Sequence, residues 1–333
     1  MQRMLKAVHA KFLTLASCAI AVAAVTTAAP VHAAFPDRPV KVVVPFAPGG
    51  GTDLVARTMG IAMGQELGQP VIIDNKPGAG TIIGTDAVAK SPADGYTLVM
   101  ATVAHVVNPS LQSKLPYNYE KGFAPVMLVG VSPNVLVVRA DSPFKSVRDV
   151  IAAAKAHPGK LSFASQGAGT SAHLAGELFK NLTKTDITHI PYRGAGPAIT
   201  DLLGGQVDIM FATAAAVGTF VESGKLRALA VTTATRSTTP ALAKVPTIAE
   251  SGVPGYVADS WYGLYAPAGT PPDVIARLNA AAKKAVQTEA FRKRVESEGL
   301  VINGGSPEEF DRYAKGEEAR WRKVVKENRI TTD

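Results

Sequence analysis

The sequence is poor in the features that define several classes of protein. Its single cysteine, Cys18, cannot form an internal disulfide, which excludes a disulfide-stabilised scaffold. Aromatic residues make up 6% and charged residues 19% of the 333 residues, whereas hydrophobic residues make up 47%. This balance is typical of a globular chain and excludes collagen-like, disordered and coiled-coil proteins. Beyond the N-terminus the sequence has no long apolar run, which excludes a membrane protein with several spans.

The one long apolar run, residues 12–25, follows a stretch with three basic residues and precedes a small-residue segment that ends at Ala33. This order is typical of a secretory signal peptide. We therefore predict that residues 1–33 are a signal peptide that is cleaved, and that the mature protein is periplasmic. A lipoprotein anchored through Cys18 is the alternative. It is disfavoured because only six residues separate Lys11 from Cys18 and the apolar run continues beyond it.

The net charge is modest once the predicted signal peptide is removed. The whole chain has 35 basic and 27 acidic side chains, a net charge of +8, and the predicted signal peptide holds three basic residues and no acidic ones. The mature chain therefore carries +5. A small and dispersed positive excess suits an anionic small molecule and does not indicate nucleic-acid binding. We expect no nucleic-acid partner.

Strand-like and helix-like runs alternate through most of the mature chain, which predicts an α/β fold with parallel strands. Residues 40–45 form a continuous apolar run, as expected for a strand buried on both faces. Capping boxes at Ser146, Thr270 and Ser306 predict three helix starts. Further strands are predicted at 71–74, 96–102, 135–139, 161–165, 188–190, 208–211 and 226–232, and helices at 53–67, 81–90, 146–157, 171–182 and 198–203.

Two apolar extended segments, residues 135–139 and 261–266, are spaced so that the chain would cross twice between two lobes. This spacing predicts a second lobe that is inserted into the first and joined to it by a two-strand hinge. Asp259 lies at this predicted hinge, where we favour a structural role over a role in the cleft. The predicted lobe limits are residues 34–135 and 260–333 for lobe 1 and residues 136–259 for lobe 2.

Four strand-to-helix junctions are rich in glycine and small hydroxyl residues. Each brings a helix N-terminus, with its free backbone N–H groups, to the carboxyl edge of a sheet, where anions and other ligands bind. One such loop is often only a tight connection, but four in one chain predict an anion-binding site. In chain order, the first to fourth loops are residues 47–52, 77–81, 166–171 and 192–196.

The third loop also fits part of a dinucleotide-binding fingerprint, Gly167-x-Gly169-x-x-Ala172. That fingerprint needs an acidic residue at the end of the next strand, and here the strand runs into Pro191-Tyr192-Arg193. Arg193 would suit a 2′-phosphate. A nucleotide-binding enzyme that uses the Gly167–Ala172 loop therefore stays open as the alternative function.

Patterns for catalysis and metal binding are scarce. No histidine forms a zinc-protease pair, and there is no Gly-x-Ser-x-Gly elbow. His173 and Glu177 are four residues apart on a predicted helix, which favours a helical side-chain pair over a metal site. We therefore predict no catalytic residue, no metal site and no cofactor.

Two further polar residues lie beside predicted strands. His105 follows the strand at 96–102 and would lie at its carboxyl edge, so we include it among the candidate ligand contacts. A core or capping role for His105 is equally open. Asp208 comes at the start of its strand, which is the wrong end for the cleft, and we interpret it as structural.

Nine longer stretches are distributed along the mature chain from residue 45 to residue 271. They are PFAPGGGTDLVAR (45–57), DNKPGAG (74–80), DGYTLV (94–99), NPSLQSKLPY (108–117), SQGAGTSAHLAGELF (165–179), PYRGAGPAITDLLGGQVDIMF (191–211), GKLRALAV (224–231), PTIAESGVPGY (246–256) and WYGLYAPAGTP (261–271). In this order they resemble the extracytoplasmic solute receptors of the tripartite tricarboxylate transporter family, often called Bug receptors.

The resemblance implies a type II periplasmic binding protein, in which two α/β lobes close over a ligand. It also implies capture of a small carboxylate, such as a dicarboxylate, an acidic amino acid or an aromatic acid, by backbone amides and hydroxyls. The expected partner is a membrane permease of the tripartite type or a sensor kinase, and we expect a monomer without enzymatic activity. The matching positions are Phe46, Gly49, Gly50, Thr52, Ala79, Gly80, Thr81, Gly169, Thr170, Ser171, Gly194 and Ala195.

One position departs from the family pattern. The family usually has a second glycine where this chain carries Thr81. Two effects of this side chain are open, a narrower pocket or an added hydrogen-bond donor.

Overall fold

The computed structural model describes residues 35–237, 239–296 and 299–331. The predicted signal peptide, including Cys18, lies outside these described residues, and its cleavage stays a prediction. Within the described residues, none of the helices combines the length and the apolar character that crossing a membrane requires.

The first sheet contains six strands among the described residues. They are β1 (Val40–Val44), β2 (Val71–Asn75), β3 (Thr97–Ala101), β4 (Phe123–Ser132), β10 (Ser260–Pro267) and β11 (Val301–Ile302). Their order across the sheet is β11-β4-β10-β3-β1-β2. β1 pairs in parallel with β2 and β3, whereas β10 is antiparallel to both β3 and β4.

The second sheet contains five strands among the described residues. They are β5 (Asn134–Arg139), β6 (Ser162–Ser165), β7 (Thr188–Pro191), β8 (Ile209–Thr213) and β9 (Leu226–Val231), in the order β7-β6-β8-β5-β9. β6 is parallel to β7 and β8, and β5 is antiparallel to β8 and β9. Both sheets therefore have the expected parallel strands. The strands next to the points where the chain passes between the sheets, β4, β5, β9 and β10, pair in antiparallel fashion.

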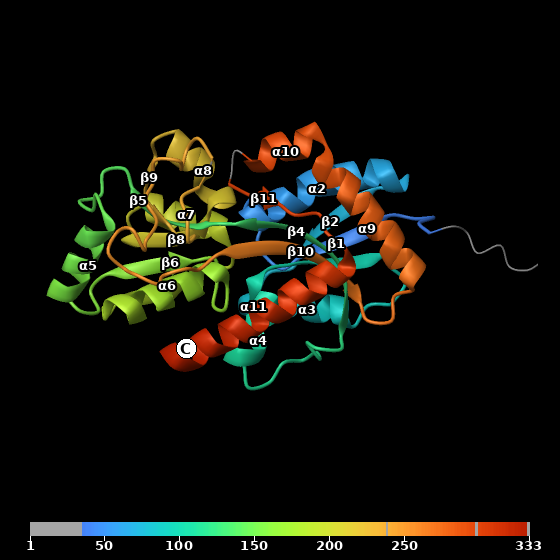
Figure 1. The fold of residues 1–333 in the computed structure, drawn as a ribbon, viewed down its shortest axis with the longest axis horizontal. Coiled ribbons are helices and arrows are strands. Elements are labelled where there is room, and N and C mark those ends of the chain that lie inside the picture. The colour runs from blue at the N-terminus through green and yellow to red at the C-terminus, as the bar shows by residue number, and fades with distance from the viewer. Residues whose placement is uncertain (1–34, 238, 297–298, 332–333) are drawn as a thin grey trace, which may run out of the picture. The chain divides into compact units, whose positions relative to one another are not determined.

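Helices cover both faces of each sheet (Figure 1). In the first sheet α2 and α9 pack together on one face, and α4 and α11 pack together on the other; in the second sheet α6 lies opposite α7 and α8. The helices are α2 (Gly51–Leu67), α3 (Ile82–Ala89), α4 (Val103–Leu111), α5 (Val147–Ala156), α6 (Ser171–Thr183), α7 (Ala195–Leu203), α8 (Ala214–Glu222), α9 (Pro272–Gln287), α10 (Glu289–Glu296) and α11 (Pro307–Asn328), with a short 3₁₀ turn η1 (Ala79–Thr81) before α3.

Two of the three predicted capping boxes are confirmed. Ser146 and Ser306 each accept a hydrogen bond from the backbone three residues on, at the starts of α5 and α11. The third prediction was wrong, because α9 begins after Pro271 and the Thr270 hydroxyl donates instead to the Pro267 carbonyl at 2.8 Å. A proline at the helix start fixes the backbone there, so a side-chain cap is not needed.

The chain passes from the first sheet to the second at Pro133, between β4 and β5, and returns between β9 and β10. The two predicted crossing segments do not themselves pass between the sheets. Residues 135–139 lie inside β5, just after the first crossing, and residues 261–266 lie inside β10, just after the second. A central strand and a crossing strand are both buried apolar runs, so the sequence pattern does not separate them. The predicted lobe limits stay a prediction.

Buried Asn134 connects the two segments that pass between the sheets. Its backbone N–H donates to the Thr232 hydroxyl at 2.9 Å, and its side-chain amide donates to the Ala258 carbonyl at 2.8 Å. Thr232 follows β9 and Ala258 precedes β10. One side chain thus joins the outgoing and the returning segments.

The strand β4 and the helix α4 were not predicted from the sequence. β4 contains Pro125 and α4 contains Pro109, and proline disfavours both kinds of element because it lacks a backbone donor. In the structure β4 pairs with β10 and β11, and α4 packs against α11. Tertiary packing outweighs the local preference in both places.

Candidate ligand-binding site

The four glycine-rich loops, with the strand ends that precede them, meet around one small cavity of about 190 Å³. The first two loops extend from strands of the first sheet, and the last two from strands of the second. The cavity wall consists of Pro45, Phe46, Gly78, Ala79, Gly80, Thr81, Gln166, Gly167, Ala168, Thr170, Pro191, Tyr192 and Arg193. Of the predicted ligand-binding residues, those in this wall are Phe46, Ala79, Gly80, Thr81 and Thr170.

Loops from the two sheets touch each other beside this cavity. The Ala47 N–H of the first loop donates to the Arg193 carbonyl of the fourth at 3.0 Å. The second loop approaches the third so closely that a Cβ on Gly80 would clash with the Ala168 carbonyl oxygen. Gly80 also has a φ of +58°, which disfavours other residues. The structure therefore shows the arrangement of a closed site.

The first loop is organised by the buried carboxylate of Asp53, in the first turn of α2. This carboxylate accepts hydrogen bonds from the Gly49 N–H at 2.9 Å, the Asn75 side-chain amide at 2.9 Å and the Arg57 guanidinium at 3.0 Å. Burial acts to raise the pKa of Asp53, but these hydrogen bonds outweigh it and lower the pKa. The Gly49 N–H, a predicted ligand donor, is thus held by an internal carboxylate.

The rest of the first loop lies beside the cavity rather than in its wall. Asn75 also donates to the Phe46 carbonyl at 3.0 Å, which fixes the end of β1 against β2. A Cβ placed on Gly50 would lie 3.5 Å from the Cβ of Ala195 in the fourth loop. Thr52 is buried in the first turn of α2. Gly50 and Ala195 therefore form a contact between the first and fourth loops.

The second loop has an unusual backbone. Ala79, Gly80 and Thr81 all have positive φ, at 47°, 58° and 81°. Such a conformation is rare for a β-branched residue and occurs mainly where surrounding structure enforces it. Here the Asn108 side-chain amide, from α4, donates to the Gly80 carbonyl at 3.0 Å and to the Thr81 hydroxyl at 3.3 Å. The positive φ of Thr81 is one that glycine adopts more easily, so glycine would suit this position.

The third loop uses its hydroxyl groups internally. Thr170 is the N-cap of α6: its hydroxyl donates to the Gly167 carbonyl at 2.7 Å and accepts from the His173 N–H. The Ser171 hydroxyl donates to the Asn134 side-chain oxygen at 3.1 Å. The Gly169 N–H donates to Nδ1 of His173 at 3.1 Å. Three groups expected to contact a ligand are therefore engaged with the protein in this structure.

The fourth loop contributes the positive charge of the site. Among the described residues of the cavity wall, Arg193 alone carries a charged side chain, and it is exposed at the edge. The neighbouring Tyr192 hydroxyl donates to the Asp201 carboxylate at 2.7 Å, and burial together with this contact raises the pKa of Tyr192 to about 12. Gly194, with φ +145°, precedes α7 and packs against Ala47.

His105 does not belong to this cavity wall, although it lies at the carboxyl end of β3. Its ring stacks on Tyr265 at 4.7 Å and meets the edges of Phe123 and Tyr119, in the wall of a different cavity of about 240 Å³. Burial lowers the pKa of His105 to about 3. The surroundings are those of a core histidine, the second of its two predicted roles.

The two aspartates singled out in the sequence also lie away from the cavity wall. Asp208 accepts hydrogen bonds from the backbone N–H and the hydroxyl of Ser162, at 2.8 and 3.0 Å, which is a structural contact. Asp259 is half-buried at the end of the segment that returns to β10, and desolvation of its carboxyl raises its pKa to about 6. Across the described ranges, no group of three or more His, Cys, Asp or Glu side chains is placed to hold a metal ion.

Several residues of the site were missed in the sequence. Asp53 could have been found, because an acid in the first turn after a glycine run indicates a group that holds the helix N-terminus. Asn108 and Asn75 had no local signal, since each acts on groups at least 22 residues away along the chain. Gln166 and Tyr192 enter the wall only because the loops converge.

Residues 55–330 match a sequence family described as the tripartite tricarboxylate transporter family receptor. The chain belongs to this family. The match covers most of the chain and includes three of the four loops whole, together with the part of α2 that follows residue 54.

Solved structures of similar proteins agree with this assignment. The periplasmic binding protein BugD is 33% identical, with a TM-score of 0.86 over 89% of this chain and 99% of its own. Rpa4515 of R. palustris, solved with adipate, is 38% identical, with a TM-score of 0.85 over 89% and 99% of the two chains. MatC of Rhodopseudomonas palustris, solved with bound malate, is 35% identical, with a TM-score of 0.84 over 87% and 100%. The fold is that of a periplasmic binding protein, and these relatives are binding proteins rather than enzymes.

Proposed function

We propose that this chain is an exported receptor that captures a small organic anion, most simply a dicarboxylate, among its four glycine-rich loops. The observation that carries the proposal is the cavity itself, whose wall combines backbone-rich loops from both sheets with one cation, Arg193. Relatives of the same fold bind malate and adipate, which are both dicarboxylates. The backbone N–H dipoles of the loops and the positive charge of Arg193 would both attract an anion of this kind.

The size of the cavity argues against the nucleotide-binding alternative. Its volume of about 190 Å³ is below the range of roughly 300–1,000 Å³ that holds drug-sized ligands. A dinucleotide is larger than such ligands. In the Gly167–Ala172 loop, the Gly169 N–H already donates to Nδ1 of His173, so this amide is not available to a nucleotide phosphate. The proposal assigns no catalytic step and no cofactor to the protein.

The proposal includes export and delivery. We infer that residues 1–33 are removed on export, that the mature receptor works in the periplasm as a monomer, and that it passes its ligand to a permease of the tripartite type. A sensor kinase is the other candidate recipient. N-terminal sequencing of secreted protein should find Ala34 or Phe35 first, whereas a lipid-modified Cys18 would contradict this part.

The ligand class can be tested by titration. Purified mature protein is mixed with malate, adipate, glutamate, nicotinate, NAD and NADP, first in thermal-shift assays and then by calorimetry. We expect at least one carboxylate to raise the melting temperature and to bind at a single site. A shift with nucleotides and none with carboxylates would overturn the proposal.

A pair of glycine variants tests whether the loops close over the ligand. Gly80→Ala should weaken carboxylate binding by about tenfold or more, because its Cβ would meet the Ala168 carbonyl of the opposing loop. Gly224→Ala is the matched control: Gly224 also has positive φ, 68°, but nothing lies within 4 Å of its Cβ position. Equal affinities for the two variants would show that contact between these loops is not needed for binding.

A further inference from the structure

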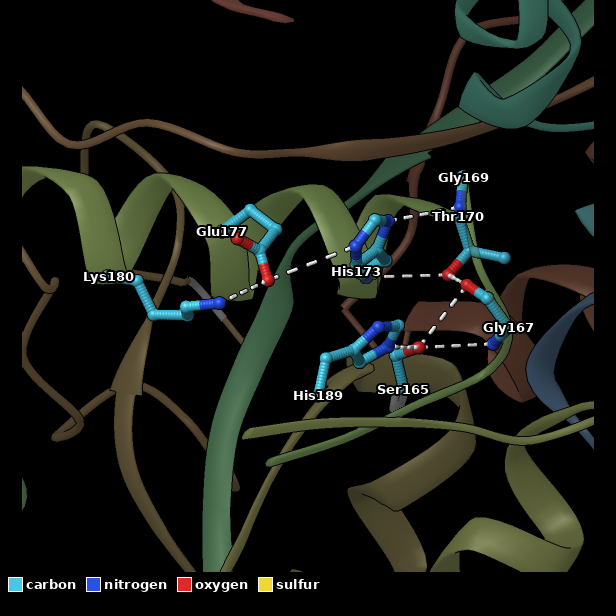
Figure 2. A network of polar contacts seen from close by, with 8 residues as sticks. All are labelled: Ser165, Gly167, Gly169, Thr170, His173, Glu177, Lys180 and His189. Carbon is cyan, nitrogen blue, oxygen red and sulfur yellow. Dashed lines mark hydrogen bonds and ion pairs between the residues drawn. The ribbon is translucent and has the colours of Figure 1, made fainter. Parts of the chain in front are cut away.

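A pair of stacked histidine rings lies directly behind the third loop (Figure 2). His173 comes from the first turn of α6 and His189 from β7, and their ring centroids are 4.2 Å apart with the planes inclined by only 18°. The other face of His189 stacks on Phe163, at 4.6 Å. His173 is buried. The pair is therefore fixed by packing on several sides.

Each ring holds part of the third loop through a nitrogen atom. Nδ1 of His173 accepts the Gly169 N–H at 3.1 Å. Nε2 of His189 lies 2.7 Å from the Ser165 hydroxyl, and this hydroxyl accepts the Gly167 N–H at 3.2 Å. Two backbone amides of the turn are thus tied to the histidine pair, one directly and one through Ser165 (Figure 2).

These contacts decide which groups of the turn face the cavity. Gln166, Gly167, Ala168 and Thr170 contribute to its wall, whereas Gly169, whose N–H points to His173, does not. Gly167 and Gly169 have φ of 134° and 76°, so the turn depends on backbone conformations that need support. The histidine rings supply that support through Gly169 and Ser165, which are not part of the cavity wall.

The hydrogen bond to Gly169 requires a neutral His173, because a protonated Nδ1 cannot accept. Burial lowers the pKa of His173 to about 4 and that of His189 to about 3. The charged groups near the pair are on α6: the Lys180 ammonium is 2.8 Å from Glu177, whose carboxylate is 3.9 Å from Nε2 of His173. From β6 the neighbours are Ser165 and Phe163, which carry no charge.

We propose that His173 and His189 are positioning residues for ligand binding, which hold the third loop in its binding shape by accepting the Gly169 amide and ordering Ser165. This inference rests on the proposed function, because it assigns the pair a role in that same site. Neither histidine is part of the cavity wall, and the two rings act through the loop backbone.

Three variants of His173 separate positioning from packing. In His173→Asn the side-chain oxygen takes the place of Nδ1, so the acceptor for Gly169 is kept. In His173→Leu the bulk is kept and the acceptor is lost, and in His173→Gln a polar side chain is kept but its amide lies one bond further out. His157→Asn, at an exposed position after α5, is the control for a generic loss of imidazole.

The readouts are calorimetric titration with malate and adipate at neutral pH, a melting curve, and the amide signals of Gly167 and Gly169 in ¹⁵N–¹H spectra. We expect His173→Asn to bind within about threefold of wild type, and His173→Leu and His173→Gln to bind about tenfold more weakly. The Gly169 amide signal should keep its hydrogen-bonded position in His173→Asn and lose it in the other two.

Two results would overturn the inference. If His173→Leu binds carboxylates with wild-type affinity, the pair only supports the fold. The same conclusion follows if His173→Asn loses as much affinity as His173→Leu. If wild-type protein binds no carboxylate, the proposed function fails, and the amide spectra still decide the positioning role: unchanged Gly167 and Gly169 signals in both His173→Leu and His173→Gln would refute it.

Discussion

The first and third loops each hold a glycine amide at the start of a helix, but they use different side chains to do so. Each joins a buried strand to a helix, and each fixes the amide of one glycine to a side chain in the first turn of that helix. The first loop uses the ionised carboxylate of Asp53, supported by Arg57, whereas the third uses the neutral imidazole of His173. In both loops the glycine amide is held inside the protein. A glycine-rich helix start is therefore not in itself a free anion site, and the donors for a ligand are those left over.

The hydrogen bonds that hold the two glycine amides should be lost under different conditions. The carboxylate of Asp53 has a pKa below its ordinary value and stays charged through the neutral range. His173 must stay uncharged, which burial enforces. The first loop thus depends on an ion pair with hydrogen bonds, and the third on exclusion of water.

The largest expected effect comes from breaking the first loop. Asp53→Ala leaves the Gly49 amide and the Arg57 Nε–H without their acceptor and should lower the free energy of unfolding by about 3 kcal/mol. Denaturation in urea measures this loss. Asp311→Ala, which removes an exposed i,i+4 pair with Lys315, is the control and should change stability by no more than about 0.5 kcal/mol. A similar small change for Asp53→Ala would show that the carboxylate is not needed to hold the loop.

The second prediction separates the two loops by pH. The folded pKa of His173 is about 4 against an ordinary 6.5, so the unfolded state takes up the proton first as pH falls. Stability from the buried neutral ring is complete above about pH 6.5 and is lost as the pH falls towards 4. Asp53 contributes to this loss only below its ordinary pKa of 3.8.

Melting temperatures measured from pH 7.5 to pH 4 check this difference. His189 and His105, with pKa values lowered to about 3, add to the same acid slope, so His173→Asn should reduce the slope without abolishing it. An identical slope in wild type and His173→Asn would contradict the assignment.

A smaller effect is expected from the cap of the third loop. Thr170→Ala removes the N-cap of α6 and should cost about 1 kcal/mol of stability, with carboxylate affinity changed by less than about threefold. Thr170→Ser keeps the hydroxyl and should restore the stability. Weaker binding by about tenfold at unchanged stability would instead support the role predicted from the sequence, in which this hydroxyl contacts the ligand.

The smallest expected effect concerns Arg193 at the edge of the fourth loop. Arg193→Gln should weaken binding of a dicarboxylate by about threefold and reduce its dependence on salt, since an exposed charge acts mainly at long range. Arg193→Lys should behave as wild type, and Lys323→Gln, an exposed charge outside the cavity wall, should have no effect. Titrations at two salt concentrations distinguish these variants.

The strand-and-helix order of the chain could be read from local patterns. The apolar run before the first loop is β1, and the boxes at Ser146 and Ser306 begin α5 and α11 as predicted. The four loops were also recognisable, because glycine and hydroxyl residues between a strand and a helix are a local signal. The crossing between sheets was misplaced by a few residues, since burial looks the same on either side of Pro133.

The sequence by itself therefore determined the α/β order, the family and the loops that meet around the cavity, because each depends on residues that are neighbours in the chain. Only the tertiary structure decided which groups of those loops remain available to a ligand. Asn108 reaches the second loop from α4, His189 reaches the third from β7, and Asn134 joins the Ser171 hydroxyl to the segments between the sheets. A hydrogen bond depends on the distance and direction between two groups, and those are set by packing between elements far apart in the sequence.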